Sequence, residues 1–170
     1  MSLDINVLKN NLTTPQRTFK WEFDIPSPKG SGGSDLWNVR AVSTNEPEVS
    51  FEEIVVEYKG TEGFVVPGRK RNTHQFTVTL IESEDGKTLD AITSWMELIR
   101  SGLTGAGVPD PMLKTDVIIS KFGTDNTVTK RIKMKGAWIK KKGETTFAQD
   151  SNEVQMYEVT FAFDQWVVVD

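Results

Sequence analysis

The 170-residue sequence contains no cysteine and only one histidine, His74. The absence of cysteine excludes disulfide bonds, thiolate metal sites and cysteine nucleophiles. Because His74 has no second histidine or cysteine with which to share a metal ion, we interpret it as a structural or solvent-exposed residue. The sequence therefore predicts no metal site and no cofactor, and it gives no positive sign of an enzyme.

Long apolar runs are also missing. No stretch approaches the roughly 18 residues that would cross a bilayer, and the first residues, MSLDINVLKNNLTTPQ, lack the basic-then-apolar layout of a signal peptide. We therefore expect no membrane insertion and no secretion through a signal. With 37% hydrophobic residues, 26% charged residues and a net charge of −4, the composition is that of an ordinary soluble globular protein. The length suits a single domain over residues 1–170.

Alternation of apolar and polar residues with a period of two dominates the sequence and indicates strands. It predicts roughly seven of them, at residues 18–25, 36–43, 51–58, 74–80, 115–122, 127–138 and 154–166. One convincing helix is predicted over residues 85–102, with an apolar stripe formed by Leu89, Ile92, Met96 and Ile99. This set of elements predicts a mainly β fold, an antiparallel β-sandwich or barrel with one α-helix.

Charged residues gather on two of the predicted strands. A basic stripe of Arg131, Lys133 and Lys135 shares one face of strand 127–138, and together with the lysines at 140–142 it is the best candidate for binding a nucleic acid. The net negative charge and the lack of an aromatic side chain on that face argue against this function. Acidic residues, among them Glu53 and Glu57, occupy strand 51–58, where a solvated sheet face is a simpler interpretation than an acid–base pair.

The last third of the chain carries the most specific motifs, namely KGAW at 135–138, DSNE at 150–153, YEVT at 157–160 and DQW at 164–166. Together with VPG at 66–68 and TVT at 77–79, these motifs resemble the major tail tube proteins of contractile-tail bacteriophages. The resemblance covers residues 17–166. It implies a β-sandwich protomer with one helix, which assembles into stacked hexameric rings whose inner strands form one continuous β-barrel.

The resemblance also implies a function and a set of partners. The chain is expected to be a structural virion protein without enzymatic activity or cofactor, assembled in the host cytoplasm into the tube that conducts DNA during ejection. Its expected partners are further copies of itself, the tail sheath, the baseplate and the tail terminator, while DNA passes through the lumen without specific binding. Two alternatives stay open: a tube subunit of a phage-derived injection particle or a baseplate tube initiator, and, more remotely, a monomeric nucleic-acid-binding β-barrel.

Residues 59–72 hold a Pro-Gly pair followed by three cations, which is more than a hairpin needs to reverse the chain. We predict a projecting hairpin arm here, which docks on a neighbouring subunit or ring through its cations; a flexible N-terminal arm is expected at residues 1–15. The residues assigned to the docking hairpin are Tyr58, Lys59, Val66, Pro67, Gly68, Arg69, Lys70 and Arg71.

A conduit for DNA should not hold its cargo, because each neutralised phosphate adds affinity. We therefore assign Glu53 and Glu57 to the channel wall and the basic stripe to the outside or to a subunit contact.

Overall fold

The computed structural model describes residues 17–26, 34–58, 61–102, 104–147 and 152–169, so the arm expected at residues 1–15 lies outside the described residues. The described chain is mainly β, as the sequence predicts, with antiparallel strands throughout. Its elements are β1 (Trp21–Asp24), α2 (Ser34–Arg40), β2 (Ala41–Thr44), β3 (Val49–Tyr58), β4 (Thr61–Asn72), β5 (Gln75–Ile81), α3 (Lys87–Ile99), α4 (Asp110–Leu113), β6 (Thr115–Phe122), β7 (Val128–Lys142), β8 (Met156–Ala162) and β9 (Gln165–Val169).

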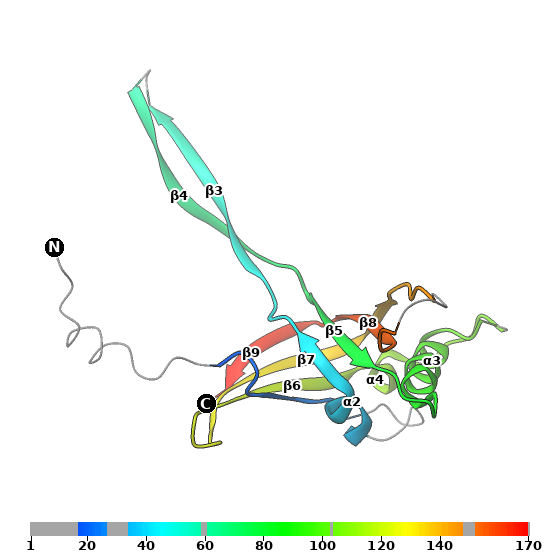
Figure 1. Cartoon of the computed structure of the whole chain (residues 1–170). Helices are drawn as coiled ribbons and strands as arrows, with labels where there is room; N and C mark the ends of the chain where they lie inside the picture. Colours follow the sequence, from blue (N-terminus) through cyan, green and yellow to red (C-terminus); the bar gives the residue numbers. More distant parts are fainter. Residues whose placement is uncertain (1–16, 27–33, 59–60, 103, 148–151, 170) are drawn as a thin grey trace.

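The strands of the body form a continuous path in the order β1-β6-β7-β8-β5-β2, and β9 also pairs with β7. The long strand β7 therefore belongs to two layers. Residues 131–135 of β7 pair with β9, and residues 138–142 pair with β8. One layer consists of β1, β6, β7 and β9, and the other consists of β7, β8, β5 and β2 (Figure 1).

An aromatic core fills the space between the layers and the helices. The rings of Phe76 and Phe161 stack with centroids 5.1 Å apart, and Phe23 of the opposite layer meets Phe76 edge-on at 6.3 Å. Trp37 from α2 and Trp95 from α3 are fully buried and contact each other edge-on at 5.7 Å. The two helices are thus anchored on the sheet through their tryptophans, which supply large apolar areas to the core.

The helices correct two predictions. Residues 36–40, predicted as the start of a strand, lie in α2, where Trp37 is buried and Val39 is 81% exposed; on a strand these two side chains would share a face. In α3 the buried stripe contains Ala91, Ile92 and Trp95, while Leu89 and Met96 are more than a third exposed. The predicted stripe is therefore rotated, because Trp95 rather than Met96 enters the core.

A β-bulge at Gly136 corrects a third prediction. Gly136 has a φ of 65°, and the buried positions of β7 change there from Ile132 and Met134 to Ala137 and Ile139. Trp138 therefore does not share a face with Ile132, as strict alternation predicts, because one left-handed residue shifts the alternation by one position.

Candidate assembly interface

Strands β3 and β4, which lie between β2 and β5 in the sequence, form a hairpin that projects far from the body (Figure 1). The predicted arm over residues 59–72 is too short, because β4 is one continuous strand from Thr61 to Asn72 and the whole of β3 belongs to the arm. Pro67 and Gly68 lie within β4 rather than in a turn. Pro67 is tolerated because β4 pairs, among the described strands, only with β3. A side chain at Gly68 would meet the Glu52 carbonyl oxygen at 3.0 Å, so the bare backbone allows the close approach of β3.

Cross-strand register divides the arm into two faces. Opposite residues share a face, and the pairs Ile54–Val66 and Val56–Phe64 define the apolar face of the arm. Its side chains are open to solvent in the single subunit, with exposed fractions of 50% for Ile54, 36% for Val56 and 59% for Phe64. A two-stranded ribbon with such a surface is at best marginally stable by itself, so these side chains call for a covering partner.

The opposite face of the arm, here termed the acidic face, carries both predicted channel residues. Glu53 and Glu57 alternate with Val55, which is 60% exposed and pairs with Val65. The two glutamates are exposed and lie on the projecting hairpin, not on the sheets of the body. The acidic strand identified from the sequence is therefore one side of the arm.

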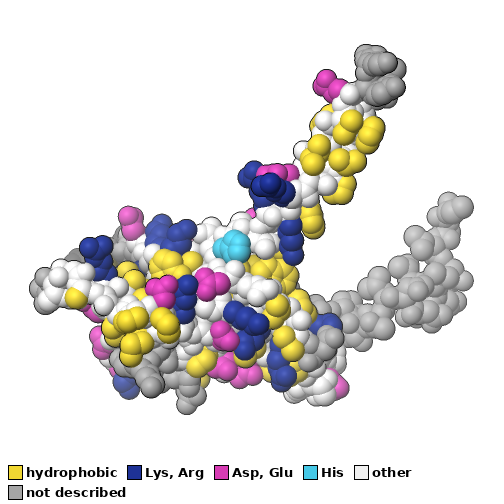
Figure 2. Space-filling view, turned by 180° about the vertical axis from the view of Figure 1, so that it is seen from behind, with side chains coloured by type: hydrophobic (Ala, Val, Ile, Leu, Met, Phe, Trp, Pro, Cys, Tyr) yellow, Lys and Arg dark blue, Asp and Glu magenta, His cyan; other side chains and the backbone are white. Residues whose placement is uncertain are grey.

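The predicted docking cations lie near the root of the arm. Figure 2 shows Lys and Arg side chains there and hydrophobic side chains nearer the tip. Arg71 forms an ion pair with Glu52 of β3, and the Lys70 ammonium lies 5.9 Å from the centre of the Trp166 ring. Two of the three cations thus have contacts within the chain, and Arg69 is exposed. Lys59 lies outside the described residues, as does the side chain of Tyr58.

The basic stripe lies on the other layer of the body. Arg131, Lys133 and Lys135 follow one another on the outward side of β7, where they pair with β9, while the arm grows from the layer that contains β2 and β5. Lys133 donates to Asp116 at 2.8 Å, and this hydrogen bond is the largest cause of the lowered pKa of the Asp116 carboxyl. The structure therefore brings the stripe together but separates it from the arm.

Two of the motifs that carry the resemblance meet at the Gly136 bulge. The Asp164 amide donates to the Lys135 carbonyl at 3.0 Å, and the Lys114 ammonium binds the Asp164 carboxylate at 3.1 Å. A Cβ atom at position 136 would overlap a carboxylate oxygen of Asp164. KGAW and DQW are therefore structural motifs, which hold the bend between β8 and β9 against β7.

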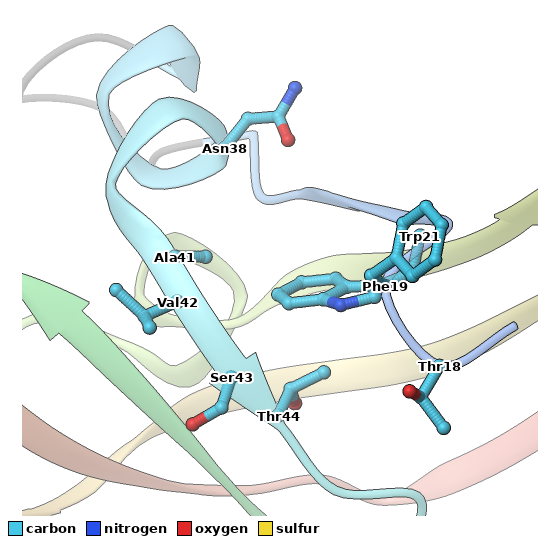
Figure 3. Close-up of a pocket in the computed structure, with 8 residues that line it drawn as sticks. All are labelled: Thr18, Phe19, Trp21, Asn38, Ala41, Val42, Ser43 and Thr44. Atoms are coloured by element: carbon cyan, nitrogen blue, oxygen red, sulfur yellow. The ribbon is translucent and has the colours of Figure 1, made fainter.

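Sequence reasoning missed a groove between β1 and β2, at the two ends of the sheet path (Figure 3). Its apolar walls include Phe19, Trp21 and Val42. Little in the sequence points to this groove. Phe19 belongs to an alternating run, which predicts that its side chain is buried, but the side chain is 66% exposed.

The described part of the chain contains no group of three or more His, Asp or Glu side chains able to hold a metal ion. None of its helices combines the length and the apolar character that a membrane crossing requires.

Comparison with known proteins gives relatives by sequence, although no protein-family model matches the chain. The chain is 32% identical over 99 residues to the tail tube protein gp19 of Enterobacteria phage T4, covering 56% of this chain and 61% of the relative. It is 25% identical over 134 residues to the tail tube protein of Serratia phage KSP90, covering 76% and 74%. The match thus spans about three fifths of the length of the T4 relative. These relatives are named as tail tube proteins and not as enzymes, in agreement with the predicted structural role.

Solved structures support the fold. The sheath/tube terminator of an extracellular contractile injection system superposes with a TM-score of 0.67 at 16% identity, covering 94% of this chain and 99% of that one. The tube-terminating cap of the anti-feeding prophage gives 0.66 at 17% identity, covering 93% of both chains. At these identities the likeness shows the fold alone. Tail tube proteins are components of the phage or injection particle, which agrees with the predicted location in the virion. The comparisons confirm the predicted resemblance: the chain is similar in sequence to tail tube proteins of phages and similar in fold to tube-terminating proteins of contractile injection systems.

Proposed function

We propose that the chain, acting as one domain, is the repeating subunit of a tail tube, which closes into hexameric rings that stack and enclose a channel for DNA. The observation that carries this proposal is the arm, whose apolar side chains are exposed in the single subunit. An apolar β-ribbon projecting from one copy and buried on the next makes a head-to-tail contact, which a tube repeats along its axis. Closure of the rings also removes the free strand edges of the single subunit.

The arm is the proposed connector between rings or neighbouring subunits. Burial of its apolar face supplies the main attraction, while Arg69, Lys70 and Arg71 at its root contribute orientation. The similar structures include a sheath–tube complex, a tube terminator and a baseplate, so the same kinds of partners are proposed for this chain.

The two faces of the arm suggest how the channel is lined. If the apolar face packs on the wall of the next subunit, the acidic face with Glu53 and Glu57 turns away from that wall and toward the lumen. Acidic side chains there repel phosphate and let DNA pass. Arg131, Lys133 and Lys135 lie on the layer from which the arm does not grow, and we place them outside or at a subunit contact.

Negative-stain microscopy of the purified protein tests the proposal. We expect rings at low concentration and hollow rods at high concentration or on a template. Particles that stay monomeric at every concentration, and that bind oligonucleotides tightly and in a salt-sensitive way, would favour the nucleic-acid-binding β-barrel instead. Copy number in the parent particle then distinguishes a major tube protein, present in every ring, from an initiator present in one.

A further inference from the structure

The arm is attached to the body through a short joint, made of residues 45–48 on the outgoing side and 73–74 on the return side (Figure 1). The joint separates two hydrogen-bonded ladders, β2 with β5 in the body and β3 with β4 in the arm. A ribbon on flexible segments would swing, whereas a ribbon on fixed residues keeps one direction. The contacts of the joint therefore decide how the arm is presented to a partner.

Asn45 ends the body ladder on the outgoing side. Its amide donates to the Thr77 carbonyl at 3.3 Å, and the Thr77 amide donates to the Asn45 side-chain oxygen at 2.6 Å. In a regular antiparallel pair, two opposite residues exchange both of these hydrogen bonds between their main chains. The Asn45 side chain takes the place of a main-chain carbonyl, so the backbone leaves the sheet here while the Thr77 amide keeps an acceptor.

Both residues of the return side are hydrogen-bonded. The Thr73 amide donates to the Glu48 carbonyl at 3.4 Å and closes the base of the arm. The carbonyl of the next residue, His74, accepts from the Phe163 amide at 3.0 Å and so belongs to the body. His74 has a φ of 48°, a left-handed conformation that turns the chain sharply between the two ladders. The return side thus passes from arm to body without a free residue.

Glu46 and Pro47 complete the joint. The proline ring fixes the φ of Pro47, and this residue is buried. Glu46 forms an ion pair with Lys121 of β6, in the layer from which the arm does not grow. Trp166 of β9 belongs to the same layer, and its ring centre lies 5.9 Å from the Lys70 ammonium of the arm. The root of the arm is therefore held by both layers of the body.

We propose that the joint presets the direction of the arm in the single subunit, with Asn45, Glu46 and Lys121 as positioning residues; the inference rests on the proposed tube function. A connector that already points in its docked direction loses less conformational freedom when it docks. A preset arm therefore lowers the concentration needed for assembly. The apolar face of the arm still supplies the attraction, and the joint determines where that face points.

Single-molecule energy transfer at subnanomolar concentration, where copies do not meet, measures the direction of the arm. The full chain carries one dye on the arm at Val65→Cys and one on α4 at Met112→Cys, and it has no other cysteine. We expect one narrow distribution of transfer efficiency for the native joint. Asn45→Ala removes the acceptor for the Thr77 amide and should broaden or shift the distribution. Asn45→Asp keeps an acceptor oxygen and should leave it unchanged.

The ion pair is tested separately, and because Glu46 is exposed its variants carry the test if Asn45→Ala fails to fold. Glu46→Lys should broaden the distribution and raise the critical concentration for assembly about two- to fivefold, the effect of losing one surface ion pair. Exchanging the charges, Glu46→Lys with Lys121→Glu, should restore both values. The matched control is Glu84→Lys, at an exposed acid beyond the other end of β5, which changes the net charge equally and should alter neither value.

The outcomes separate this inference from the tube function. A distribution for the native joint as broad as that of Asn45→Ala, or one that none of the joint variants changes, would overturn the joint as the feature that presets the arm. Joint variants that move the arm yet assemble at the wild-type concentration would overturn its role in docking. A narrow wild-type distribution without any rings or tubes counts instead against the proposed function and leaves the preset direction standing.

Discussion

The apolar face of the arm offers the sharpest test of how the subunits hold together. Replacing Ile54, Val56 and Phe64 by Thr places β-branched, strand-forming residues at all three positions and reduces the exposed apolar surface of this face. Fully burying one such side chain contributes about 1.5–3 kcal/mol. Scaled by exposed fractions of 50%, 36% and 59%, the three together contribute at most about 2–4 kcal/mol for each docked arm, since Thr keeps one methyl group at each position. The triple variant should therefore raise the critical concentration for tube formation at least about tenfold and at most about 1,000-fold.

Sedimentation over a concentration series measures this quantity, and negative-stain images identify the polymer. The fold should survive, because the three side chains lie outside the core; an unchanged melting temperature and far-UV circular dichroism spectrum would show this. A matched control replaces three other exposed apolar residues by Thr. These are Val39, Phe147 and Val154, with exposed fractions of 81%, 78% and 57%.

The control variant should assemble at the wild-type concentration. Equal assembly of the arm variant and the wild type would refute the reasoning, since it would mean that the apolar face stays in water within the tube. Equal losses in both triple variants would point to general surface hydrophobicity rather than to the arm.

Three further predictions concern the cations, the bulge and the acid response. Reversing the cations at 69–71 to Glu should weaken stacking more at low salt than at high salt, as sedimentation at two ionic strengths would show; a salt-independent loss would argue against electrostatic docking. Gly136→Ala should destabilise the fold by about 1–2 kcal/mol through its positive φ alone, with more from the clash with Asp164, and urea unfolding measures it. Burial opposes ionisation of Glu82, but hydrogen bonds from the amides of Leu89, Ser83 and Thr88 outweigh it and lower its pKa. The stability that ionised Glu82 contributes is therefore present above the ordinary carboxyl pKa and is lost as pH falls through the lowered pKa. Glu82→Gln should flatten the decline of melting temperature below about pH 4. A decline equal to that of the wild type would exclude Glu82 as its source.

Elements with one buried face were predictable from the sequence. Strand β6 begins and ends at the predicted residues 115 and 122, because Val117 and Ile119 face the core and their neighbours do not. The region of α3 was predictable from its helical period, although its orientation was not. Whether Trp95 or Met96 enters the core depends on a residue far away in the sequence. The Trp95 indole N–H donates to the Leu113 carbonyl at 3.0 Å, and a local pattern cannot predict this contact.

Other elements were ambiguous for physical reasons. Residues 36–43 alternate well enough for a strand, yet Arg40 at the end of α2 binds Glu82, Asp85 and Thr88 and ties the helix to the start of α3. Such a tertiary network overrides local preference. In β7 the glycine was visible in the sequence, but neither its φ of 65° nor the close approach of Asp164, a residue 28 positions later, can be predicted from a local pattern.

The arm shows why the candidate site was harder to predict than the fold. The run Ile54-Val55-Val56 is apolar on consecutive positions, which is typical of a strand buried on both faces. In the single subunit these residues are exposed on both faces of a ribbon, so the pattern describes an environment that the chain does not provide alone. Glu53 and Glu57 flank the run. Charged residues beside an apolar strand oppose its aggregation with the strands of other chains. Under the proposed tube function, the burial implied by the sequence is that of the assembled particle, and moving these side chains out of water supplies free energy to hold one subunit on the next.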